Sequence, residues 1–95
     1  MTQGQIREFV DCMTYETNIV LLDEKLFWCL GVTHDADSGE CKIEVWEGDM
    51  ETREYKRNLL NFTGRSTEEC MRHFLEDKYW DGQSFYDVAP RMEWF

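Results

Sequence analysis

The sequence predicts one α+β domain, residues 1–95, with an antiparallel sheet of three to four strands and N-terminal and C-terminal helices on one of its faces. Two patterns predict this class. In the middle of the chain, apolar residues alternate with other residues on both sides of a short polar segment, as in a β-hairpin. Near both ends, apolar residues recur at helical spacing after helix-capping patterns. A chain of 95 residues can bury one hydrophobic core, so a single domain is expected.

The N-terminal segment predicts a helix followed by a strand. Thr2 and Gln5 match a capping box for a helix over residues 2–13. Ile6, Phe9 and Val10 then form one apolar stripe on that helix. Residues 18–22 are a short apolar run with β-branched members, which favours a buried strand.

The clearest pattern is the hairpin over residues 26–46. Its two alternating runs flank a turn that is rich in Asp, Ser and Gly. A loop centred in this turn places Leu30 opposite Val45 and Val32 opposite Ile43. We therefore expect these four side chains to face the core.

The second half of the chain predicts an outer strand and then helices. Residues 52–60 alternate weakly and fit an outer or edge strand. Ser66 begins a capping-box pattern for a helix over residues 67–79, and Asp81-Gly82 is expected to end this region. A further helical turn over residues 85–88 follows Ser84. The aromatic tail, residues 92–95, is expected to pack back onto the domain.

The cysteines and histidines suggest no catalytic or metal site. The four cysteines include no C-x-x-C pair, so we expect free thiols in the cytoplasm of a bacterial host cell. The hairpin places Cys29 on the face of Trp46 and Cys41 on the opposite face, so a disulfide between the two cysteines is not expected. His34 lies near Cys41 across the hairpin, but a nucleophile needs a third, orienting group and zinc needs three or four ligands. We expect no enzyme activity, no cofactor and no metal.

A calcium loop is also not expected. Asp35-Ala-Asp-Ser-Gly39 looks like the start of one. However, Glu40 occupies the sixth position, where the pattern needs Gly, and Trp46 occupies the twelfth, where it needs Glu.

The net charge limits the class of partner. The chain has 20 acidic and 10 basic residues and a formal charge of −10. Nucleic acids and anionic membranes are bound mainly through Lys and Arg, so we expect neither as a direct partner. The first residues do not match a secretory signal, and no apolar run is long enough for a transmembrane helix.

The acids concentrate in residues 35–54, where eight acidic residues face only Lys42 and Arg53, for a net charge of −6. We expect these residues on the hairpin turns and the solvent face, where carboxylates at alternate strand positions, about 6.5–7 Å apart, can imitate nucleic-acid phosphates. Aromatic residues anchor many protein interfaces, and Trp46 is the first candidate here. The predicted partner-binding residues are Asp35, Asp37, Glu40, Glu44, Trp46, Glu47, Asp49, Glu51 and Glu54.

In small size, strong acidity and the order of helix, hairpins and helices, the chain resembles the small acidic anti-CRISPR proteins of phages and mobile elements. The resemblance implies an inhibitor that mimics DNA and blocks the basic DNA- or RNA-binding site of a nuclease, such as a CRISPR-Cas effector. Two other interpretations stay open. The chain can be an immunity protein against a nuclease toxin, or a non-catalytic accessory module that forms homodimers through an exposed strand edge.

Overall fold

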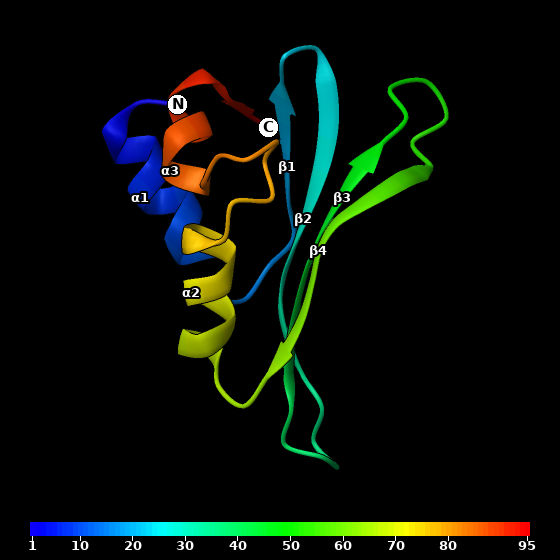
Figure 1. The fold of residues 1–95 in the computed structure, drawn as a ribbon. Helices are drawn as coiled ribbons and strands as arrows, with labels where there is room; N and C mark the ends of the chain where they lie inside the picture. The colour runs from blue at the N-terminus through cyan, green and yellow to red at the C-terminus, as the bar shows by residue number, and fades with distance from the viewer.

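The computed structural model describes all 95 residues as an α+β domain of two layers (Figure 1). The sheet is antiparallel and has the strand order β4-β3-β2-β1-β5. Its strands are β1 (Asn18–Leu22), β2 (Lys25–His34), β3 (Cys41–Gly48), β4 (Tyr55–Gly64) and β5 (Glu93–Trp94). The helices are α1 (Gln3–Cys12), α2 (Thr67–Glu76), α3 (Phe85–Val88) and a 3₁₀ turn (Ala89–Arg91). The predicted class is confirmed, and β5 is an additional strand that the sequence pattern did not indicate.

The helices begin at the predicted capping residues. The Thr2 hydroxyl accepts a hydrogen bond from the Gln5 amide at 3.2 Å, and the Gln5 side chain accepts one from the Thr2 amide at 2.8 Å. The Ser66 hydroxyl caps α2 by accepting from the Glu69 amide at 3.1 Å, but the Glu69 side chain does not return the second bond of the predicted capping box. Helix α2 ends at Glu76 rather than at residue 79, because the backbone becomes extended at Asp77.

The hydrophobic core lies between the helices and one face of the sheet. Phe9, Phe74 and Phe85 come from the three α-helices and are fully buried, with ring centroids 5.0–6.5 Å apart. Trp94 of the C-terminal tail packs edge-on against Phe9 at 5.3 Å. The Trp94 indole N–H donates to the Asn18 side-chain oxygen at 3.1 Å. The tail therefore packs onto the domain, as expected, and extends the sheet at β1.

The predicted register of the central hairpin is wrong by one residue from Leu26 to Leu30, but it is correct at the turn end of the ladder, where Thr33 lies opposite Lys42. Val32, Ile43 and Val45 face the core as expected. Leu30 lies opposite Glu44, and Cys29 lies opposite Val45. The ladder between β2 and β3 is irregular between Leu30 and Thr33, as in a β-bulge. The core face of β2 therefore carries Phe27 and Cys29, while Leu30 lies on the other face. Cys29 thus does not share a face with Trp46, and all four cysteines are free thiols.

The irregularity has a physical cause at Gly31. A Cβ atom on Gly31 would lie 2.3 Å from the backbone oxygen of Glu16, so only glycine fits against the segment that follows α1. The amide of Val32 donates to the Met13 oxygen at 3.0 Å instead of to the neighbouring strand. The contact with the α1–β1 connection therefore shifts the register of the hairpin.

Strand β4 carries two further irregularities against β3. At the first, the side-chain amide of Asn58 donates to the backbone oxygens of Val45 at 3.1 Å and Leu60 at 2.9 Å. These two bonds satisfy carbonyl groups at the point where the regular ladder is interrupted. The second lies next to Gly48, close to the turn that joins the two strands.

All helices lie on one side of the sheet, so the opposite side is not covered by any other element (Figure 1). We call this side the open face. None of the helices is long and apolar enough to cross a membrane.

Candidate functional site

Two hairpin turns carry most of the predicted acidic residues, and they are built alike. One spans residues 35–40, between β2 and β3, and the other spans residues 49–54, between β3 and β4. In each turn the amide of the first residue donates to the carbonyl of the last, at 2.9 and 2.8 Å. The carbonyl of the first residue accepts from the fifth residue at 2.9 Å in both turns. That fifth residue has a positive φ, 75° at Gly39 and 64° at Arg53.

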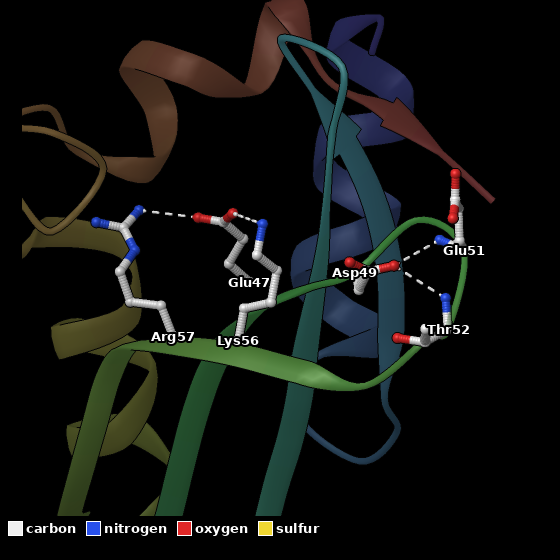
Figure 2. Close-up of polar contacts among 6 residues, drawn as sticks. All are labelled: Glu47, Asp49, Glu51, Thr52, Lys56 and Arg57. Carbon is white, nitrogen blue, oxygen red and sulfur yellow. Dashed lines mark hydrogen bonds and ion pairs between the residues drawn. The ribbon is translucent and has the colours of Figure 1, made fainter.

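The first aspartate of each turn has a structural role. The Asp35 carboxylate accepts from the amides of Asp37 at 2.9 Å and Ser38 at 3.3 Å. In the same way, the Asp49 carboxylate accepts from the amides of Glu51 at 2.8 Å and Thr52 at 2.9 Å (Figure 2). These hydrogen bonds to the charged form lower the pKa of both carboxyl groups. The other acids of the turns form no ion pair within the chain and are exposed, namely Asp37, Glu40, Glu51 and Glu54.

The lowered pKa values predict a pH dependence of stability. A carboxyl group whose pKa is lowered in the folded state stabilises the fold at every pH above its ordinary pKa of 3.8. This contribution is lost as the pH falls through the lower pKa of the folded state. Replacing Asp35 and Asp49 by asparagine keeps an accepting oxygen and removes the charge. We expect the double variant to be less stable than the parent at about pH 7 and to lose less stability on acidification to about pH 3. Urea denaturation at both pH values measures this, and equal acid sensitivity of the two proteins would contradict it.

The two turns lie at opposite ends of β3, as Figure 1 shows. The eight residues of this strand separate them by about 25 Å. The carboxylates of the predicted site therefore form two groups rather than one continuous row, and only Glu44 lies between them on the open face.

The predicted solvent-facing position of Glu47 is wrong. Glu47 points to the helix-bearing face of the sheet and is only 8% exposed. Its carboxylate pairs with Arg57 at 3.2 Å and with Lys56 at 3.6 Å (Figure 2). Glu47 shares its face with Ile43 and Val45, because strand residues two positions apart point the same way. Its charge is thus largely compensated within the chain, and its removal would leave two cations without a partner.

Glu44 lies on the open face and is half-buried. It pairs with Lys42, two positions earlier on the same strand, at 3.6 Å. An ion pair of this exposure contributes little to stability. The carboxylate of Glu44 can therefore exchange this partner for another cation at small cost.

Trp46 belongs to a group of three aromatic residues on the open face. Trp28 lies directly opposite Trp46 in the ladder. Tyr55 stacks on Trp46 with the ring centroids 5.1 Å apart and an angle of 17° between the planes. It meets Trp28 edge-on at 6.1 Å and 76°. We call Trp28, Trp46 and Tyr55 the aromatic cluster; it lies on β2, β3 and the first residue of β4, towards the 49–54 turn.

The cluster is held in place by a glycine. A Cβ atom on Gly48 would lie 2.7 Å from Nε1 of Trp28, so the missing side chain makes room for the indole ring. This Nε1 is buried and has no hydrogen-bond partner. Half-buried aliphatic residues extend the apolar surface on both sides of the indole, namely Ile19, Leu21 and Leu30.

Trp28 and Tyr55 were not among the predicted residues of the site. Trp28 lies two positions before Leu30 on the same face of the strand, so the register that placed Leu30 in the core placed Trp28 there as well. Comparison of the chain with protein-family models, curated proteins and solved structures gives no significant match. No group of three or more His, Cys, Asp or Glu side chains is arranged to hold a metal ion. What the open face and its two acidic turns can bind is therefore inferred from the chemistry of their side chains alone.

Proposed function

We propose that this chain is a non-catalytic acidic protein that binds a basic nucleic-acid-binding protein, such as a nuclease or CRISPR-Cas effector, and occludes its nucleic-acid-binding site. The observation that supports this best is the arrangement of the open face. An aromatic cluster lies on a sheet surface that no helix covers, and unpaired carboxylates flank that surface at both ends of β3.

The charge favours a basic partner. The formal charge is −10, and the four unpaired acids of the two turns are exposed at the two ends of β3. Charge complementarity of this kind increases the association rate and excludes partners of like charge. A groove that binds nucleic acid supplies the required lysines and arginines.

The aromatic cluster favours a protein partner over a free cation. Trp and Tyr are enriched among the residues that contribute most to protein–protein binding, and such residues cluster near the centre of an interface. Arginine side chains also stack on Trp and Tyr rings, and this contact is favourable in a desolvated interface. The cluster can therefore receive basic side chains that the turns attract.

The first experiment is capture from a bacterial lysate on the immobilised protein at low salt. Elution with duplex DNA is followed by a salt gradient. We expect nucleic-acid-binding proteins in the DNA eluate, because a mimic and DNA compete for one site. A stoichiometric amount of the chain should then inhibit nucleic-acid binding by the eluted protein. Captured proteins that duplex DNA does not release would contradict occlusion.

A matched pair of variants separates the turns from the overall charge. The turn variant carries D37N, E40Q, E51Q and E54Q. The control variant removes the same four charges from exposed positions of α1 and α2, with E8Q, D11N, E68Q and E76Q. We expect the turn variant to associate at least tenfold more slowly at low salt and to depend less on salt, whereas the control keeps most of the parent rate. Equal losses in both variants would show that net charge alone drives binding and would contradict a role for the turns.

A further inference from the structure

A thiol and an imidazole form a direct contact at the end of the sheet near the 35–40 turn. Cys41 and His34 are partners in the β2–β3 ladder, and Sγ of Cys41 lies 3.1 Å from Nδ1 of His34. The other ring nitrogen of His34, Nε2, lies 3.4 Å from the hydroxyl of Thr67 on α2. In the tautomer with its proton on Nε2, His34 donates to Thr67 and accepts from the thiol. Thr67 is thus the third, orienting group that the sequence alone did not reveal.

A second thiol lies next to the first. Cys41 contacts His34, which contacts Thr67 at the start of α2, and the fully buried Cys70 lies one helical turn after Thr67 on the same side of that helix. Cys41 is also the ladder partner of Gly64. Gly64 has no side chain, and a Cβ atom there would lie 2.8 Å from Oε1 of Glu69. Helix α2 therefore packs closely over this end of β3 and brings Cys70 towards Cys41. Burial, and then the neighbouring Cys41, raise the pKa of the Cys70 thiol.

The contact lies at the edge of a hollow in the surface. An open hollow of about 560 Å³ is lined by His34, Cys41, Lys42 and Thr63, together with acids of the 35–40 turn. His34 itself is exposed, although Cys41 is only 4% exposed. A proton that leaves the Cys41 thiol can pass directly to Nδ1 of His34, which lies 3.1 Å from Sγ.

We propose that Cys41 and Cys70 form a disulfide when the protein meets a hydroperoxide, with His34 as the group that accepts the proton of Cys41. In the first step the Cys41 sulfur attacks one peroxide oxygen. The S–O bond forms, the O–O bond breaks, and the imidazolium returns its proton to the leaving oxygen. The products are a sulfenic acid on Cys41 and water or an alcohol.

In the second step the Cys70 sulfur attacks the sulfenic sulfur. The S–S bond forms and the S–O bond breaks, and the Cys70 proton leaves with the hydroxide as water. Overall, two thiols lose two electrons and two protons, and one hydroperoxide is reduced. The sulfenic acid is uncharged, so the ionisation of Cys70 becomes easier once Cys41 has reacted. The disulfide ties α2 to the first residue of β3.

The remaining cysteines lack these features. Cys29 is fully buried, and burial raises its pKa far above the ordinary value. Cys12 is partly exposed and has no imidazole contact; its neighbour is the Tyr15 hydroxyl at 3.8 Å. Desolvation and nearby acids raise the pKa of Cys12. The more exposed Cys12 therefore serves as an internal control.

The test is treatment of the purified protein with hydrogen peroxide at neutral pH, followed by peptide mass spectrometry. We expect a peptide pair joined through Cys41 and Cys70 that lacks two hydrogens, formed before Cys12 is modified. C70S should instead accumulate a sulfenic acid on Cys41, which dimedone traps. H34Q should react at least tenfold more slowly, because it cannot accept the proton. T67V, which keeps both reacting groups, should also react more slowly.

Circular dichroism and denaturation establish that each variant is folded, and T67V replaces H34Q in the comparison if H34Q does not fold. Oxidation of Cys12 first, or absence of the Cys41–Cys70 pair from the products, would overturn the proposal. Equal rates of Cys41 oxidation in the parent and both imidazole-site variants would overturn the role of His34.

Discussion

Replacing Trp46 by alanine is expected to weaken binding to the captured partner by at least tenfold, mainly through faster dissociation. Trp46 stacks on Tyr55 and lies opposite Trp28, so its removal leaves a gap in the middle of the aromatic cluster. Interface residues of this kind typically contribute about 2 kcal/mol or more, which is about a thirtyfold change in Kd. Surface plasmon resonance against the partner isolated by capture measures both rate constants. Charge neutralisation in the turns should act on the association rate instead, so the two kinds of variant are kinetically distinct.

A pair of tyrosines provides the control for this prediction. Tyr55 is 52% exposed in the aromatic cluster, and Tyr86 is 54% exposed on α3, in the other layer of the molecule. Y55A should increase the dissociation rate, and Y86A should leave it unchanged. If both substitutions have the same effect, or if W46A binds as the parent does, the open face is not the binding surface.

Replacing Gly31 by alanine is expected to destabilise the fold more than any other glycine-to-alanine change in the chain. The added Cβ would lie within 2.3–2.7 Å of three backbone atoms of Glu16, and backbone cannot move aside as the end of a side chain can. Overpacking of this kind costs about 1–3 kcal/mol, and occasionally more. We expect a loss in the free energy of unfolding of about 3 kcal/mol, measured by urea denaturation.

Gly39 is the matched control for that substitution. Its φ is 75°, and no atom lies within 4 Å of a Cβ placed there, so G39A meets only backbone strain. This strain costs about 1–2 kcal/mol for an ordinary L-residue. Arg53 adopts a similar φ of 64° in the equivalent turn, which shows that the position accepts a side chain. If G31A is no more harmful than G39A, the contact with Glu16 does not determine the bulge.

The sequence was sufficient for the starts of the helices because their signals are local. The hydroxyls of Thr2 and Ser66 each accept from a backbone amide three residues later, as the capping patterns predict, whereas the end of α2 was placed three residues too late. Strand β5 was not predictable in the same way. It has two residues and exists only because the tail returns to pair with β1.

The site was predicted only in part, because its geometry depends on contacts distant in sequence. The alternation of β2 gave two opposite faces, but the Gly31–Glu16 contact decided which face meets the core. The predicted register therefore assigned Trp28 to the interior. The sequence did indicate that Glu47 faces the core, because it lies on the same face of the strand as Ile43 and Val45, but the count of acidic residues obscured this pattern. The likeness of the two turns was also visible, as Asp-x-Asp-Ser-Gly-Glu and Asp-x-Glu-Thr-Arg-Glu.

The interrupted ladder of β4 has a consequence for self-association. β4 is an outer strand, and a straight outer strand would offer its free backbone groups to another chain and extend into fibrils. Its two irregular positions bend and twist this edge, and Lys56 and Arg57 add charge along it. These features disfavour the pairing of β4 with the edge strand of another copy of the chain. A variant with a straightened β4 should form aggregates long before it loses its native secondary structure.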